Sequence, residues 1–238
     1  MSDRSKKVRK NRMLKMESLE NRELMAADVT ANLSRGTLQI SGSDRADQVV
    51  VNQVGQNITV SLGSSRPFAS FSASQVNSLR VNLNGGNDIL NVNLYQKSLD
   101  AVFVEMGSGS RERVDLKLGS ARTLAVNAVN SFSTTAILSG NIQSRAEIDF
   151  GTDTGADNLF VNNSTFGMLD VKLGGGNDEF RMSNSKIDRA AIDFGAGDDW
   201  LNNVQSEVSS GSIDGGTAVR GNRWSGSRFS SRVAVRGF

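Results

Sequence analysis

The chain has 238 residues, with no Cys, no His and a single Pro. Without Cys it can form no disulfides or thiolate metal sites, and without His it can hold no Ser–His–Asp triad and no imidazole-ligated metal. The net charge of +2 hides an asymmetry, because residues 28–216 carry 14 basic and 21 acidic side chains. An acidic body argues against a nucleic-acid binder, which normally presents a basic face.

The first 28 residues form a basic segment that lacks the apolar stretch of a standard export signal. Eight basic side chains lie within residues 1–27, and the longest apolar run that follows the basic cluster is Leu24–Ala27. A secretory signal would carry an apolar stretch of about 7–15 residues. The segment is therefore expected to be flexible or a short solvated helix, unless it serves another targeting route.

Residues 16–28 resemble the LEPR-xLL segment found near the N-termini of many planctomycete proteins thought to be exported. The matching positions are Leu19, Glu20, Arg22, Leu24 and Ala26. Asn21 stands where that segment has Pro, and Met25 stands where it has Leu. The resemblance implies an exported, extracellular or cell-surface destination.

A repeat of about 22 residues organises the rest of the chain. Its clearest copies, 81–90, 171–180 and 192–201, each join an apolar alternation to a Gly-rich turn and an Asn-Asp or Asp-Asp pair. One apolar residue before each turn marks the period, with steps of 19–23 residues. The markers are Ile40, Leu62, Leu83, Met106, Ala128, Phe150, Leu173, Phe194 and Ile213. Near-equal periods of this length indicate a repeat architecture.

Within each period the apolar residues alternate with a step of two, as in strands. Phe166, which lies seven residues before the marker Leu173, adds a third apolar position to its period. Three short strands cannot bury their apolar faces alone, so successive periods must stack in parallel. The sequence therefore predicts an all-β, right-handed parallel β-helix of about nine coils over residues 33–216. The side chains expected to point inward are Val171, Leu173, Phe180, Met182, Phe166, Leu90, Phe150, Phe194 and Leu201.

The organisation predicted from these patterns has three parts: a targeting-like segment (1–28), a β-helix (29–216) and an Arg-rich tail (217–238). The last coil of a solenoid exposes apolar surface and strand edges. Because the tail contains Trp224, Phe229 and Phe238, we expect it to cap that coil. Asn residues at equivalent corners, such as Asn163 and Asn184, predict amide ladders and left-handed backbone.

The turn sequence Gly-Gly-Asn-Asp-x-Leu at 85–90 resembles the RTX haemolysin-type nonapeptide and related surface β-helices, and the resemblance is confined to the turns. An acid recurs at one place after the turn in several periods. The series is expected to break at Arg111, because the turn at 106–111 contains no acid. The candidate metal ligands are Asp157, Asp178, Asp199 and Asp88. Stacked carboxylates repel one another, and Ca²⁺ between them would remove that cost. Asp149 and Asp193 offer further oxygens nearby. The alternative is that each Asp accepts backbone N–H bonds in its turn.

Coils of 19–23 residues leave no room for the long inserted loops from which β-helix lyases and glycosidases usually build a substrate groove. The body's lysines (Lys97, Lys117, Lys172 and Lys186) lie at unrelated positions of the repeat. We therefore expect a non-catalytic exported or cell-surface protein with a structural or adhesive role. Its expected partners are surface polysaccharide or envelope proteins, and nucleic acid is not expected among them. The chain itself is expected to have no transmembrane segment. The alternative is a carbohydrate-active enzyme or a sugar-binding module, with Tyr95, Trp200 and Trp224 as the large rings for stacking.

Overall fold

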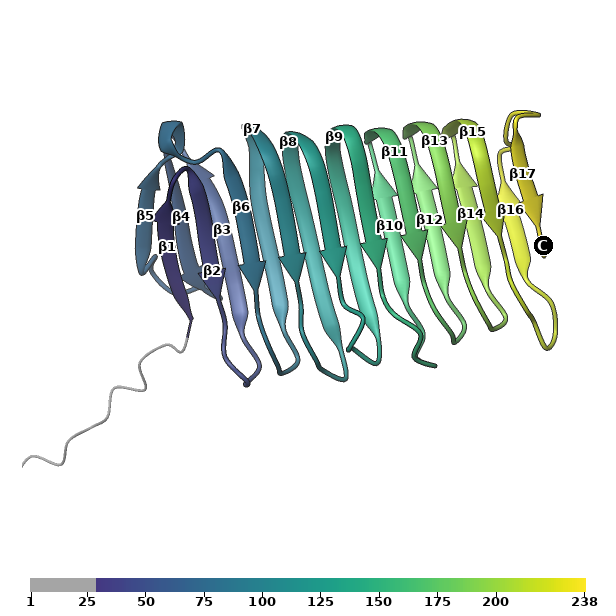
Figure 1. Ribbon diagram of the computed structural model, residues 1–238, viewed down its shortest axis with the longest axis horizontal. Coiled ribbons are helices and arrows are strands. Elements are labelled where there is room, and N and C mark those ends of the chain that lie inside the picture. The colour runs from purple at the N-terminus through teal and green to yellow at the C-terminus, as the bar shows by residue number, and fades with distance from the viewer. Residues whose placement is uncertain (1–28) are drawn as a thin grey trace, which may run out of the picture.

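The computed structural model describes residues 29–238 and shows a β-solenoid of about seven turns (Figure 1). The predicted parallel β-helix is thereby confirmed, while the targeting-like segment 1–28 lies outside the described residues. The described part contains no α-helix, and its one helical turn is the 3₁₀ segment η1, Ala73–Gln75. No helix in residues 29–238 is long and apolar enough to cross a membrane.

Each coil contributes one strand to each of two parallel stacks. The first stack consists, in order, of β2 (Thr37–Ser41), β6 (Ser78–Asn82), the C-terminal halves of β7 (Ile89–Glu105), β8 (Glu112–Asn127) and β9 (Thr134–Asp149), then β11 (Thr165–Lys172), β13 (Lys186–Asp193), β15 (Glu207–Asp214) and β17 (Val233–Arg236). The second consists of β3 (Gln48–Val54), the N-terminal halves of β7, β8 and β9, then β10 (Asn158–Asn162), β12 (Glu179–Ser183), β14 (Trp200–Val204) and β16 (Arg223–Gly226). Gly-rich turns connect the first stack to the second, and tight corners lead back.

The core lies between the two stacks and follows the predicted alternation. All nine side chains expected to point inward are buried, and Phe150, Phe180 and Phe194 are among the largest of them. The third apolar position is also buried, but it does not form a separate strand. In β11 the register shifts between Phe166 and Met168, so this position belongs to the first, bent end of one longer strand.

The N-terminal end departs from the repeat, which explains why there are about seven turns where the spacing predicts nine. β3 continues into the antiparallel strands β4 (Asn57–Leu62) and β5 (Ala69–Ser72), so the marker Leu62 lies in a meander and not in a coil. β2 pairs directly with β6, across the interval assigned to two periods. β1 (Thr30–Ser34) pairs antiparallel with β2 (Figure 1). The antiparallel strands thus cover the N-terminal edge of both stacks.

Both outermost markers sit two residues out of register. Ile40 pairs with Val81, and Ile213 pairs with Ile192. The residue that follows Phe194 in its own column is Gly215, because Asp193 pairs with Asp214. A strand alternates with a period of two, so a shift of two residues keeps every apolar side chain on the same face and leaves the pattern unchanged.

The C-terminal residues fill the space left by Gly215. A Cβ at Gly215 would lie 2.8 Å from the ring of Phe238, and that ring packs edge-on against Phe194 with centroids 5.2 Å apart. β16 and β17 extend both stacks, and Trp224 of β16 stacks on Phe229. Residues 217–238 therefore continue the solenoid and close its last interior layer.

Close stacking of the coils predicts that one glycine is far less replaceable than another. A Cβ on Gly197 (φ 152°) would overlap the carbonyl oxygen of Gly176 in the preceding coil, whereas a Cβ on Gly55 (φ 58°) meets nothing within 4 Å. The change to Ala strains the backbone by about 1–2 kcal/mol at Gly55 and by about 1–3 kcal/mol at Gly197. Gly197→Ala should add an overpacking cost of about 1–3 kcal/mol, measured by denaturant unfolding. Equal losses for the two variants would contradict the stacking.

The packing of Phe238 against Phe194 gives a second prediction. Phe238→Ala uncovers Phe194 and should lower the free energy of unfolding by roughly 1–3 kcal/mol, below the roughly 3–5 kcal/mol of a fully buried Phe. Phe132→Ala is the matched control, because Phe132 is 56% exposed and should lose little. Thermal melts followed by circular dichroism compare the two, and a loss at Phe238 no larger than at Phe132 would exclude a capping role.

Candidate functional site

An acidic ladder runs through the interior where each chain segment leaves its Gly-rich turn. Its members share one register position in successive coils and are at most 3% exposed. They are Asp88, Glu112, Asp157, Asp178 and Asp199. The structure thus brings all four predicted metal ligands onto one line, although Thr134 interrupts it between Glu112 and Asp157. Glu112 follows Arg111 directly, so the expected gap in the series at that residue does not occur.

Each ladder carboxyl accepts a hydrogen bond from the backbone of the coil before it. The N–H of Asp157 donates to Oδ1 of Asp178 at 2.8 Å, and the N–H of Asp178 donates to Oδ1 of Asp199 at 2.9 Å. The N–H of Asp88 donates to Oε2 of Glu112 at 2.9 Å. Asn222 ends the series by accepting the N–H of Asp199 at 2.7 Å. The carboxyls therefore accept backbone N–H groups, as in the alternative interpretation, but the donors lie in the neighbouring coil and not in the same turn.

The second oxygen of every ladder carboxyl is buried without a hydrogen-bond partner. Burial raises the pKa of Asp178 and of Glu112 to about 8, against the lowering effect of the backbone N–H bonds. The same cause raises the pKa of Asp157 to about 7, and of Asp88 and Asp199 to about 6. At neutral pH the acids with the highest pKa values hold protons, which reduces the repulsion expected of stacked carboxylates without any metal ion.

The ladder offers an incomplete set of ligands for calcium. Among residues 29–238, no three His, Cys, Asp or Glu side chains group closely enough to hold a metal ion. Ca²⁺ takes about six to eight oxygens, and one oxygen of each ladder carboxyl is already committed to a backbone N–H. The unpartnered oxygens of Asp157, Asp178 and Asp199 would have to be joined by backbone carbonyls. Calcium at the ladder is therefore a hypothesis that competes with protonation.

The Asn or Asp that precedes three of the ladder acids, Asp88, Asp178 and Asp199, accepts backbone N–H groups in the opposite direction, from the following coil. Oδ1 of Asn177 accepts the N–H of Asp198 in the following coil at 2.8 Å. Oδ1 of Asp198 accepts three N–H groups, from Val219, Arg220 and Gly221, and these bonds lower its pKa. In each recurring Asn-Asp or Asp-Asp pair, the first side chain therefore accepts backbone N–H groups of the following coil. The second side chain accepts a backbone N–H of the preceding coil.

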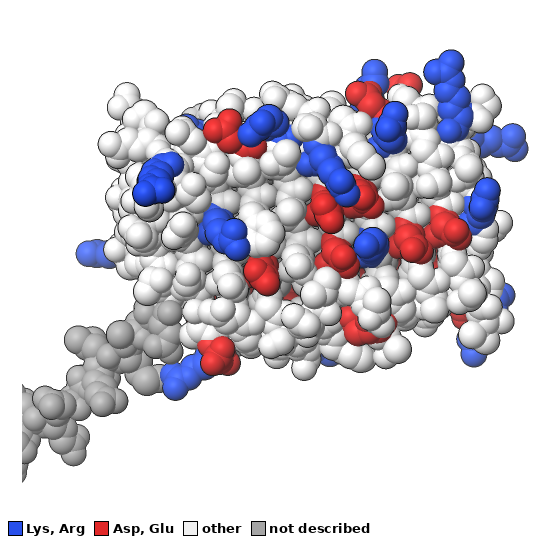
Figure 2. Space-filling model, viewed as in Figure 1, with Lys and Arg blue, Asp and Glu red and all other residues white. Residues whose placement is uncertain are grey.

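The acids outside the ladder also serve the turns. Asp149 and Asp193, considered above as spare metal oxygens, accept the N–H two residues further on, each at 3.0 Å. Acidic and basic side chains interleave on the face that Figure 2 shows. Arg145 binds Asp170 at 2.6 Å, and Lys172 lies 3.9 Å from Asp149. These surface charges therefore pair with one another and do not converge on a site.

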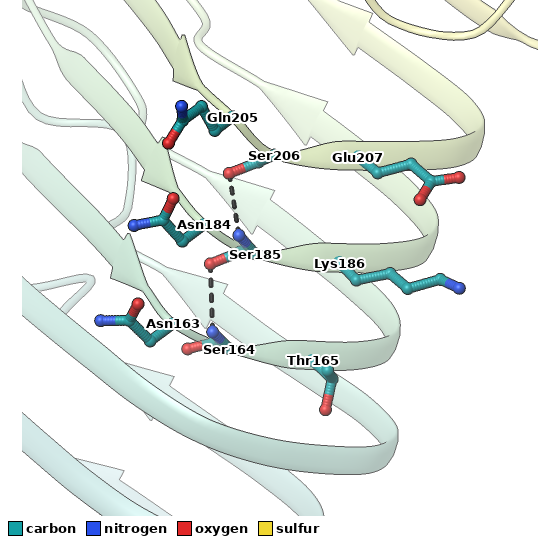
Figure 3. Close-up of a pocket in the computed structure, with 9 residues that line it drawn as sticks. All are labelled: Asn163, Ser164, Thr165, Asn184, Ser185, Lys186, Gln205, Ser206 and Glu207. Atoms are coloured by element: carbon teal, nitrogen blue, oxygen red, sulfur yellow. Dashed lines mark hydrogen bonds between the residues drawn. The ribbon is translucent and has the colours of Figure 1, made fainter.

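A second, serine ladder occupies the corners between the two stacks. The N–H of Ser164 donates to Oγ of Ser185 at 3.1 Å, and the N–H of Ser185 donates to Oγ of Ser206 at 3.0 Å (Figure 3). Each hydroxyl in turn donates to the carbonyl two residues earlier in its own coil. This ladder was not predicted from the sequence, although an amide-Ser dipeptide recurs every 21 residues at 163–164, 184–185 and 205–206.

The residues before these serines form an outward amide row: Asn163, Asn184 and Gln205. Their backbones are left-handed, with φ of 48°, 49° and 54°, as predicted for the two Asn. The predicted amide ladder is not formed here, because none of these three side chains hydrogen-bonds to another described residue. The buried amide of Asn203 instead bonds to the backbone of Ser206 and Ser227.

A shallow corner groove follows the amide row. Three residues from each of three coils line it, 163–165, 184–186 and 205–207 (Figure 3). An adjoining hollow shares Asn163 and Thr165 and reaches Tyr95, whose side chain is 58% exposed. Of the other predicted stacking rings, Trp200 donates its ring N–H to Ser225, and Trp224 is covered in part by Phe229. Tyr95 is therefore the predicted ring that lines the hollow next to the groove.

Comparisons with known proteins returned nothing: no family model, no curated protein and no solved structure matches the chain.

The raised pKa values predict an unusual dependence of stability on pH. Between pH 4 and 8 the folded ladder keeps protons that the unfolded chain has lost, so folding takes up protons and the free energy of unfolding falls as pH rises. We expect the melting temperature in EDTA to drop by several degrees across this range, since 1 kcal/mol corresponds to about 2–4 °C in a domain of this size. A melting temperature that rises with pH would refute protonation of the ladder.

The Asp178→Asn variant tests the same point at one position. Asn keeps the acceptor oxygen and is uncharged at every pH, so the variant should melt at or above the wild-type temperature at pH 8.5 and show a shallower pH dependence. Asp188→Asn, at an exposed position of β13, should leave the pH dependence unchanged. A large loss of stability in Asp178→Asn at high pH would mean that the ionised carboxylate is needed.

Calcium titration separates the competing hypotheses. A protonated ladder needs no ion, so the melting temperature at pH 7.5 should not respond to millimolar calcium or to chelator. Calcium bound to the ladder would instead stabilise the fold by about 2.7 kcal/mol at a hundred times its Kd, and Asp178→Asn would lose most of that gain.

Proposed function

We propose that this chain is a non-catalytic exported or cell-surface protein with a structural or adhesive role. The observation that carries the proposal is the commitment of its polar side chains to holding neighbouring coils together. The acidic ladder and the serine ladder join side chains of one coil to the backbone of the preceding coil, and the turn-capping residues join side chains to the backbone of the following coil. A protein built in this way gains a long, regular surface, and its buried acids are out of reach of a substrate.

The enzymatic alternative needs an accessible pair of carboxyls. Glycoside hydrolysis uses two, placed about 5–9.5 Å apart on either side of the scissile bond. Among the residues that line the corner groove, Glu207 carries the one carboxyl and Lys186 carries the one amine. The ladder carboxyls are at most 3% exposed and cannot reach a glycan. This arrangement supports a surface that binds over one that cleaves.

Export is supported by the resemblance of residues 16–28 to the planctomycete segment. Its test is the location of the protein in its native host, followed with an antibody raised against the purified chain. We expect the antigen on intact cells or in the medium, where added protease removes it while a cytoplasmic marker survives. A variant lacking residues 2–28 should stay inside the cells. Full-length protein that fractionates with the cytoplasmic marker would refute export.

Catalysis is tested separately on the purified chain. We expect no time-dependent release of reducing ends or unsaturated sugars from neutral or acidic polysaccharides. Product that accumulates with wild-type protein and disappears in Glu207→Gln would overturn the non-catalytic assignment and favour the glycosidase or lyase alternative.

A further inference from the structure

We infer that the corner groove binds a linear, uncharged polysaccharide laid along the axis of the solenoid. This inference rests on the proposed adhesive role and names the class of its ligand. Its starting point is the amide row, where three outward side chains repeat at one place in three successive coils. Parallel strands rise about 4.8 Å per coil, roughly the length of one sugar ring in an extended chain. A periodic surface of this kind fits a periodic polymer.

The chemistry of the row matches hydroxyl groups. Each amide offers one acceptor and two donors, and a sugar hydroxyl both donates and accepts. The amides of Asn163, Asn184 and Gln205 have no hydrogen-bond partner among the described residues, so they are free to bind. The serine hydroxyls beneath them already bond to backbone carbonyls and accept backbone N–H groups. The serine ladder therefore fixes the row in place and leaves the contacts to the amides.

The backbone of the row makes the choice of residue informative. Left-handed φ values favour Gly, and Gln adopts them less readily than Asn does. Gln205 nevertheless holds φ at 54°, at a strain of about 1–2 kcal/mol. Strain of this kind gathers at functional sites, where the surrounding structure holds it. Because the backbone of the row is held before a ligand arrives, binding has to order only the three side chains.

The charge of the groove selects against polyanions. In the corner groove the positive charge of Lys186 balances the negative charge of Glu207. In the adjoining hollow Lys117 lies 4.0 Å from Asp115. A phosphate backbone would need an excess of Lys and Arg. The exposed ring of Tyr95, in the hollow that adjoins the groove, provides an apolar surface for a sugar ring. An uncharged glycan satisfies all of these features.

Affinity electrophoresis tests the inference with three soluble probes: hydroxyethyl cellulose, mannan and dextran. We expect at least one of them to retard the full-length protein. The triple variant Asn163→Gly, Asn184→Gly, Gln205→Gly should bind that probe at least tenfold more weakly, and Tyr95→Ala should weaken binding as well. Gly accepts the left-handed backbone without a clash, so the variant removes the amides while keeping the fold, which a circular dichroism melt verifies.

Arg35→Gly is the matched control, because it makes the same kind of change at a left-handed residue (φ 48°) in the β1–β2 turn, outside the groove. Its affinity for the probe should be unchanged once its mobility is normalised to a gel without polysaccharide. The inference is overturned if no probe binds, or if the triple variant binds as well as wild type. Heparin and single-stranded DNA serve as polyanionic comparison probes, and the inference is also overturned if only these bind. The same holds if light scattering shows that the amides mediate self-association. None of these results would alter the export or catalysis tests, so the adhesive proposal can fail or survive separately.

Discussion

The backbone N–H groups at strand ends are the groups that this solenoid must satisfy. Within the two stacks, neighbouring strands pair in parallel and use up their donors. At the turns and corners the strand ladder stops, and a buried N–H without an acceptor costs about 1–3 kcal/mol. The chain meets this demand with side chains from adjacent coils: carboxyls in the interior, Asn or Asp in the turns and Ser at the corners. These acceptors therefore recur at equivalent positions in successive coils, with the same period as the rest of the repeat.

The interior acceptors create a second problem, which is charge. A stack of ionised carboxylates away from water would repel, and burial would penalise each one. Oxygen is nevertheless the right acceptor for an N–H, and a neutral carboxylic acid supplies it. The raised pKa values of Asp178 and Glu112 express this compromise. Asn222, which closes the series, is an uncharged acceptor in the same line. At Thr134, which interrupts the series, the N–H of Glu112 donates instead to the backbone carbonyl of Ser133.

The periodic part of the fold could be predicted from the sequence because stacking forces each coil to repeat the same apolar and Gly positions. Leu62 could not be excluded as a marker, since its spacing matches the period although it lies in an antiparallel meander. Ile213 looked equivalent to Phe194 because alternation hides a shift of two residues, and only the pairing of Asp193 with Asp214 reveals it. The line of acids was visible in the sequence, but the direction of its hydrogen bonds was not. That direction depends on side-chain conformations, which residue spacing does not specify.

The two interior ladders have a polarity that bears on how the chain reaches its native state. In both, the N–H of one coil donates to a side chain of the coil that follows it in sequence. A nascent chain emerging from its N-terminus would therefore hold each new coil with unsatisfied donors until the next coil had been added. The antiparallel strands at the N-terminal end offer a ready template on which the first coil can form. Coils would then form in sequence order, one coil behind the point of synthesis, until Asn222 accepts the last N–H of the acidic ladder.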